Sequence, residues 1–160
     1  MSTLKRYRKP GGFKQLLILL ETSPATKKEQ LLKIVAAEDK RWAGELEKRI
    51  LTMNKILSWK IEVVEKIMQL IPEQTWPKAL FHLSPDDRQK LFVQLIQFLP
   101  QTRQKQMNES LAGLAPTPGE IEAAHLLIIK KVREMQANGD LKLEQFDANL
   151  NLDGIDKVLM

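Results

Sequence analysis

The sequence predicts an all-α protein built from short helical hairpins. Two observations indicate this fold class: apolar residues recur at helical spacing along most of the chain, and residues typical of helix starts precede each apolar segment. Of the 160 residues, 43% are hydrophobic and 28% are charged, which is ordinary for a folded globular protein. The length suits one compact domain or two small helical subdomains.

Four helices are predicted in the first half of the chain. They cover residues 13–21, a segment opened by Thr26 and Glu29, about 39–53, and 58–71. Thr26 and Glu29 form a T-x-x-E capping box, in which each side chain accepts a hydrogen bond from the other residue's backbone N–H group. Pro72 ends the fourth helix because proline cannot continue one.

The second half predicts a short helix over 75–83 and three longer ones. Ser84, followed by Pro85 and two aspartates, begins the next helix, which ends before Pro100. Residues 101–111 are polar with few apolar anchors, so this helix is expected on the surface. The last helix begins with the capping box of Thr117 and Glu120 and ends at Asn138-Gly139. Its predicted apolar face consists of Ile121, Ala124, Ile128, Val132 and Met135, with Lys130, Lys131, Arg133 and Glu134 largely on the other side.

The sequence offers no recognisable catalytic or metal-binding pattern. The absence of cysteine excludes disulfides, thiolate metal sites and a cysteine nucleophile. His82 and His125 have no histidine or cysteine partner at metal-ligand spacing, so structural or surface roles are expected for both. We therefore expect no enzyme activity, no catalytic residues, no metal and no cofactor.

The net charge of +5 comes largely from the start of the chain. Lys5, Arg6, Arg8 and Lys9 leave 21 basic and 20 acidic side chains for the rest. A solvated, disordered leader is the favoured interpretation, and binding of this segment to phosphates or anionic lipid is the alternative. The folded body is not expected to bind nucleic acid. No apolar run approaches membrane-spanning length, so we expect a cytoplasmic protein with at most peripheral membrane association.

A set of short motifs resembles the C-terminal region of the flagellar motor switch protein FliG. They are, in order, Gly11-Gly12, Ala79-Leu80, Ala115-Pro116, Glu122 and Gly139-Asp140-Leu141. The family pattern overlays residues 11–83 and 121–143, with a small insertion between. The resemblance implies a basic leader and Gly-Gly linker at 1–12, an armadillo-like helical subdomain at 13–57, a C-terminal helical bundle at 58–143, and a tail at 144–160, whose composition suggests poor order.

The resemblance also implies functional positions. Hinges are expected at Gly11 and Gly12 and at the apolar segment that replaces the family's M-F-x-F motif, which consists of Ile50, Leu51, Thr52 and Met53. The family's torque arginine falls near Arg103, with Thr102 as the alternative register. Together with Lys105 and Glu109, Arg103 gives the stator-facing candidates.

Several positions depart from the family pattern. Phe81 and His82 replace the lysine and glycine of A-L-K-G, and His125 replaces the glutamine of E-x-x-Q. At most Arg103, Lys105 and Glu109 remain of the family's charges on the segment 101–111, so the resemblance implies a thinned torque interface. In addition, the N-terminal and middle domains of a complete switch protein are expected to come from another polypeptide.

The resemblance implies a component of the bacterial flagellar rotor that takes part in motility and chemotaxis through protein–protein contacts. Expected partners are the rotor and switch proteins, the stator's cytoplasmic loop, and other copies of the chain through subunit stacking. The expected location is the cytoplasmic face of the inner membrane, in the flagellar basal body. The alternative is a divergent adaptor or regulatory protein that keeps the scaffold without generating torque.

Overall fold

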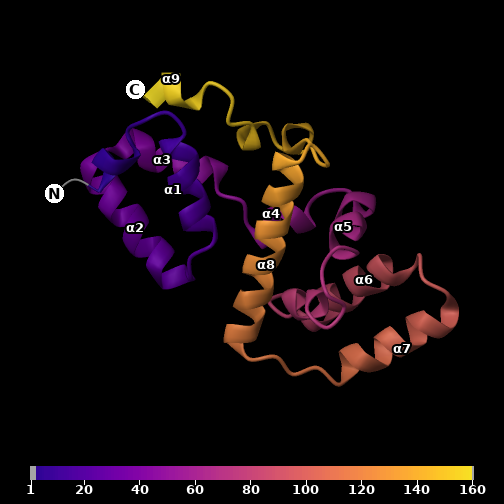
Figure 1. The fold of residues 1–160 in the computed structure, drawn as a ribbon. Coiled ribbons are helices and arrows are strands. Elements are labelled where there is room, and N and C mark those ends of the chain that lie inside the picture. Colours follow the sequence, from indigo (N-terminus) through magenta and orange to yellow (C-terminus); the bar gives the residue numbers. More distant parts are fainter. Residues whose placement is uncertain (1–2, 160) are drawn as a thin grey trace. The chain divides into compact units, whose positions relative to one another are not determined.

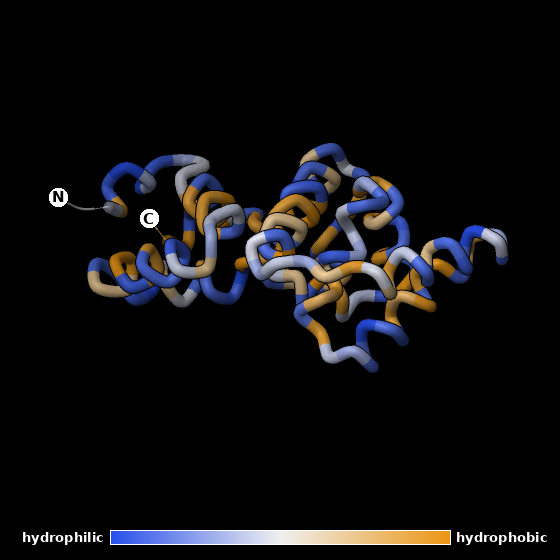
Figure 2. The backbone as a smooth tube through the Cα atoms, turned by 90° about the horizontal axis from the view of Figure 1, so that it is seen from below, coloured by the Kyte–Doolittle hydropathy of each residue, from blue (hydrophilic) through white to orange (hydrophobic). Residues whose placement is uncertain are grey.

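The computed structural model describes residues 3–159, and within that range every regular element is a helix (Figure 1). The elements are η1 (Leu4–Tyr7), α1 (Gly12–Glu21), α2 (Ala25–Glu38), α3 (Lys40–Arg49), α4 (Met53–Leu57), α5 (Ile61–Met68), η2 (Trp76–Leu80), α6 (Pro85–Ile96), α7 (Gln101–Ala112), α8 (Pro118–Ala137), η3 (Leu143–Gln145), η4 (Ala148–Leu150) and α9 (Ile155–Leu159), where η marks a 3-10 helix. Hydrophobic and hydrophilic residues alternate along the helices, which gives them apolar and polar sides (Figure 2). The predicted all-α class is confirmed.

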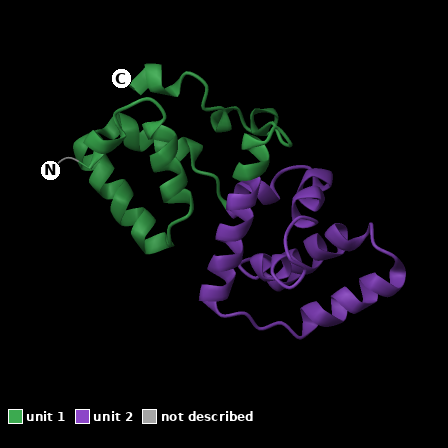
Figure 3. Cartoon of the chain, in the orientation of Figure 1, with its two compact units in different colours: residues 1–52, 133–160 green, residues 53–132 purple. Residues whose placement is uncertain are grey.

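The chain divides into two compact units (Figure 3). Unit 1 comprises residues 1–52 and 133–160, and unit 2 comprises residues 53–132. The sequence had instead placed 58–143 in one bundle, and had separated 144–160 from both subdomains. The structure divides the chain differently because residues beyond 132 contribute side chains to the core of unit 1.

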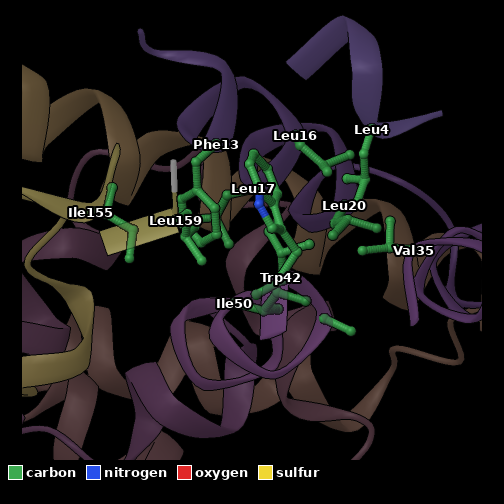
Figure 4. Close-up of a cluster of buried hydrophobic side chains, with 12 residues drawn as sticks. Leu4, Phe13, Leu16, Leu17, Leu20, Val35, Trp42, Ile50, Ile155 and Leu159 are labelled. Carbon is green, nitrogen blue, oxygen red and sulfur yellow. The ribbon is translucent and has the colours of Figure 1, made fainter. Parts of the chain in front are cut away.

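The core of unit 1 is built by α1, α2, α3 and α9 (Figure 4). Phe13 of α1 and Trp42 of α3 lie with their ring centroids 5.5 Å apart. Ile155 and Leu159 of α9 are buried in the same cluster. The expectation of a poorly ordered tail is therefore wrong for this segment, because two apolar side chains four positions apart give α9 a face to bury.

The basic leader is also folded from residue 3 onward, contrary to the expectation of disorder. The Leu4 side chain is completely buried in the unit 1 core. The backbone N–H groups of Thr3 and Leu4 donate to the Glu38 carboxylate at 2.6 and 2.9 Å. Arg8 forms an ion pair with Asp39 at 3.1 Å. One apolar residue and two acidic partners thus hold the leader against unit 1.

Helix starts in unit 1 follow the predicted signals only in part. The Asp39 side chain accepts from the N–H groups of Arg41 and Trp42, which caps α3. By contrast, α2 begins at Ala25 after Pro24, so Thr26 lies inside the helix and does not cap it. The helix predicted over 39–53 ends at Arg49, because Ile50 takes an extended conformation.

Unit 2 begins with α4, a short helix that was not predicted, because the predicted third helix ended at about Met53 and the fourth began at Ser58. The predicted fourth helix is shorter than expected, since α5 covers only Ile61–Met68. The predicted start at Ser84 is confirmed: its hydroxyl oxygen accepts from the Asp87 N–H group at 3.3 Å, and Pro85 occupies the first turn of α6. Trp76 of η2 stacks on Phe92 of α6 with ring centroids 5.4 Å apart.

Helix α8 begins in unit 2 and ends in unit 1. Its predicted capping box is confirmed, because the Glu120 N–H group donates to the Thr117 hydroxyl and the Thr117 N–H group donates to the Glu120 carboxylate. Gly139 has a φ of 81°, the left-handed conformation that closes the helix. Of the predicted apolar face, all members are buried except Ile121, which is half-buried.

Candidate partner-binding site

Helix α7 carries the three charges that the sequence singled out, and it is weakly anchored to the rest of unit 2. Met107 and Leu111 are its only buried residues. A long extended connection joins it to α8 (Figure 1). With two buried side chains in 12 residues, the helix has most of its surface available to a partner, as expected from its polar sequence.

The three charged candidates occupy different environments on α7. Lys105 and Glu109 are exposed and lie one helical turn apart, so they share one side of the helix. Arg103 is half-buried, forms an ion pair with Glu73 and also donates to the Gln106 side chain at 3.1 Å. Lys105 and Glu109 thus lie side by side, whereas Arg103 is paired with Glu73 in the segment before η2.

Two of the grooves that α7 lines within unit 2 also involve residues 77–81. One has a volume of about 410 Å³ and is lined by Glu73, Gln74, Pro77, Lys78, Arg103, Met107, Ser110, Leu111 and Leu114. The other, about 470 Å³, is lined by Phe81, Pro85, Arg88, Gln89, Asn108, Leu111, Ala112 and Leu114. Residues 77–81 contribute to both grooves, so the position of that segment affects both sides of α7.

The two glycines of the predicted N-terminal hinge have distinct conformational roles. Gly11 has a φ of 79°, which other residues rarely adopt. Gly12 is the first residue of α1, and a Cβ atom there would lie 1.8 Å from the Tyr7 carbonyl oxygen. Both glycines are therefore required for a tight turn that packs η1 against α1, while their role as a hinge stays a prediction.

The second predicted hinge segment is largely buried. Ile50, Leu51 and Met53 are buried, and Thr52 is half-buried. The Leu51 N–H group donates to the Glu21 carboxylate at 2.7 Å. This segment follows α3 and is fixed by a side chain of α1, whereas its movement as a hinge stays a prediction.

The same Glu21 carboxylate forms an ion pair with Arg133 of α8. The two distances are 2.9 Å to Nε and 2.6 Å to a terminal nitrogen, so the contact is bidentate. The side chains are only 0% and 8% exposed. Arg133 also donates to the Arg49 carbonyl oxygen at 3.1 Å and to the Gln136 side chain at 2.8 Å. The pair thus ties together α1, the end of α3 and the end of α8, all within unit 1.

The two histidines lie against each other in unit 2. Their ring centroids are 4.6 Å apart, and the ring planes are nearly perpendicular. His82 Nδ1 and His125 Nε2 each lie 2.8 Å from the Ala79 carbonyl oxygen. Two residues that depart from the expected family pattern at distant sequence positions are therefore in direct contact.

Within residues 3–159, no three side chains of His, Cys, Asp or Glu converge in a way that could hold a metal ion. No helix in that range is both long enough and apolar enough to pass through a bilayer.

The sequence family described as the FliG C-terminal domain matches residues 14–143. The chain belongs to this family. A FliG C-terminal domain is a structural component of the flagellar motor switch and not an enzyme, so the predicted function class is confirmed at that level. Membership implies partners within the switch complex and a location on the cytoplasmic side of the basal body. No curated protein and no solved structure matches the chain significantly.

Sequence reasoning missed two important residues of this FliG C-terminal domain. Arg133 had been assigned largely to the polar side of the last helix, but it is buried against Glu21. Glu21 directly follows the apolar run 16–20, so a charge at the end of a buried helix was the available signal. A charge in that position needs a buried partner, but the sequence does not identify which of the 25 basic residues it is.

Proposed function

We propose that this FliG C-terminal domain acts in the flagellar rotor and presents α7 to the cytoplasmic loop of the stator. The observation that supports this role is the small buried face of α7, which leaves Lys105 and Glu109 exposed on a helix with only two buried side chains. Exposed charges of both signs on one helix can steer an encounter and release it again. Arg103 completes the proposed contact surface.

The charge array is small, so its members must act together. An exposed ion pair contributes only about 0–1 kcal/mol. Arg103 is already paired with Glu73, so a partner carboxylate has to compete with that contact. We therefore include Glu73 in the surface: it holds Arg103 in place before the partner arrives.

Unit 1 is proposed to contact other rotor subunits by stacking. Its described helices expose large apolar side chains, among them Ile18 on α1 at 37% and Ile34 on α2 at 44%; Val158 on α9 is a third, at 50%. These side chains would lose solvent contact on stacking, which favours association. The segment from Ile50 to Met53 is proposed to act as the hinge after this unit.

Charge reversal tests the stator-facing surface. We expect the double variant Lys105→Glu/Glu109→Lys, and separately Arg103→Glu, to reduce swimming in a strain that depends on this chain and to weaken crosslinking to the stator. Lys90→Glu, at an exposed position on α6, is the matched control and should leave both unchanged. Normal swimming and normal stator crosslinking in both α7 variants would overturn this assignment.

The second candidate function is an adaptor or regulatory protein without torque generation. The observation that favours it is the small number of charges on α7, where Arg103, Lys105 and Glu109 are the only ionisable side chains among 12 residues. Under this function the α7 variants swim normally, while Ile18→Glu or Ile34→Glu abolishes co-purification with rotor proteins.

A further inference from the structure

The contact between His82 and His125 joins the η2 segment to α8 through one backbone carbonyl group. His82 follows η2, His125 lies on α8, and both rings are 2.8 Å from the oxygen of Ala79 in η2. His82 also contacts the Asn54 side chain of α4, with Nε2 2.9 Å from Oδ1. A carbonyl oxygen has two lone pairs, so two imidazole N–H donors satisfy it fully.

The hydrogen bonds of both rings can be satisfied without a charge on either. His82 donates from Nδ1 to the Ala79 carbonyl oxygen, which leaves Nε2 as an acceptor in the neutral ring. If the amide oxygen and nitrogen of Asn54 exchange places, its N–H group donates to Nε2 of neutral His82. His125 needs only its Nε2–H donor, so it is satisfied as the neutral ring.

Two effects disfavour the state in which both rings are protonated. Burial lowers the pKa of His125, the hydrogen bond to Ala79 opposes this, and the nearby His82 lowers the pKa further. Two imidazolium rings with centroids 4.6 Å apart also repel each other. Glu122, three residues before His125 on α8, favours the charged form.

Two charged groups on the surrounding elements are engaged with other partners. Lys78 of η2 is paired with Glu120 of α8 at 3.2 Å, and Arg88 of α6 lies over the Phe81 ring at 4.1 Å. Lys55 follows Asn54 on α4. Glu122 is the acidic group that raises the pKa of His125.

We propose that His82 and His125 form a proton-operated latch, which holds residues 79–82 to α8 while the pair carries at most one proton and releases them when it takes up a second. Because Lys78 and Phe81 line the two grooves beside α7, release of this segment alters the support of α7. The consequence for stator contact rests on the proposed function, whereas the latch itself does not.

Two measurements on the full chain test the latch. Imidazole NMR signals, followed from about pH 8 to about pH 5, should show coupled titration of the two rings. Hydrogen exchange should show that amides 79–83 and α7 lose protection as pH falls below about 6.5, while α1 in unit 1 keeps its protection over the same range.

Two variants separate protonation from simple packing. His125→Gln retains an N–H donor for Ala79 but cannot be charged, so it should abolish the pH-dependent loss of protection at 79–83. Asn54→Asp places a carboxylate beside His82 Nε2, which favours a charged pair, so the loss of protection at 79–83 should move to higher pH. Independent titration of the two rings in the wild type, or an unchanged pH dependence of exchange in His125→Gln, would overturn the latch. If His125→Gln does not fold, the latch is still tested by the coupled titration in the wild type and by the pH at which Asn54→Asp loses protection at 79–83. A working latch with normal swimming in the α7 charge variants would contradict the proposed stator contact alone.

Discussion

At the scale of single residues, we expect substitution of glycine by alanine to have opposite effects on stability at positions 12 and 44. Gly12→Ala would place a Cβ atom 1.8 Å from the Tyr7 carbonyl oxygen, so the backbone has to move. We expect a loss of at least about 1–3 kcal/mol in the free energy of unfolding, as in overpacked cores. Gly44→Ala in α3 meets no atom within 4 Å and should stabilise by about 0.5–1 kcal/mol. Urea denaturation of both variants gives the comparison, and a Gly12→Ala variant as stable as Gly44→Ala would contradict the tight turn.

The buried Glu21–Arg133 pair gives a second prediction at this scale. Glu21→Gln keeps an acceptor for the Leu51 N–H group but leaves the Arg133 charge without its counter-ion. Removing one member of a buried ion pair typically costs about 3–5 kcal/mol. The control is Lys48→Gln, which removes a pair whose lysine side chain is 58% exposed and should change stability by less than about 1 kcal/mol. Chemical denaturation of the two variants gives the comparison. If Glu21→Gln unfolds at the same denaturant concentration as Lys48→Gln, the buried pair does not stabilise unit 1 as expected.

Residue-scale features were predictable from sequence where the partner lies nearby in the chain. One of the two predicted capping boxes illustrates this: Thr117 and Glu120 are three positions apart, and their contact is local. The other, at Thr26 and Glu29, does not form because α2 begins one residue earlier, at Ala25. Glu21 and Arg133 are 112 positions apart, and the His82–His125 contact also spans distant segments. Helical periodicity gives the face of each residue but not which distant face it meets.

At the scale of elements, the start of α3 predicts a pH-dependent stability. Burial raises the pKa of Asp39, but hydrogen bonds from the Trp42 and Arg41 N–H groups and the ion pair with Arg8 outweigh it, so the net pKa is lowered from 3.8. The stabilisation is therefore present above the unfolded value and is lost as pH falls through the folded value. We expect Asp39→Ala to cost about 1 kcal/mol near neutral pH and progressively less under acidic conditions. Thermal unfolding of both proteins between about pH 7 and about pH 2.5 measures this, and a constant difference would contradict it.

Element boundaries were predicted less well than element types, for a physical reason. The apolar residues of 39–53 continue at helical spacing past Arg49, so the pattern predicts one helix. The structure breaks it at Ile50, where the Glu21 carboxylate accepts the Leu51 N–H bond from outside the helix. A tertiary hydrogen bond thus replaces a helical one. For α7, by contrast, the polar sequence was sufficient to predict an exposed helix, although the pairing of Arg103 with Glu73 was not visible in it.

At the scale of the whole molecule, unit 1 depends on residues beyond the matched family region. The family match ends at residue 143, while Ile155 and Leu159 belong to the unit 1 core. We expect removal of residues 144–160 to lower the unfolding temperature of unit 1 and increase hydrogen exchange in α1. Burying two aliphatic side chains contributes about 3–6 kcal/mol. Exchange in α6 of unit 2 is the internal control, and unchanged exchange in α1 would show that α9 is dispensable.

The discontinuity of unit 1 also has a consequence for synthesis on the ribosome. Residues 53–132 emerge as one uninterrupted segment and can complete unit 2 while later codons are still being translated. The first 52 residues emerge earlier and contain most of the unit 1 core, but that core is complete only when Ile155 and Leu159 have left the exit tunnel. Until Arg133 has emerged, Glu21 also lacks its counter-ion. Unit 1 is therefore completed after unit 2, although its first helices are synthesised before it.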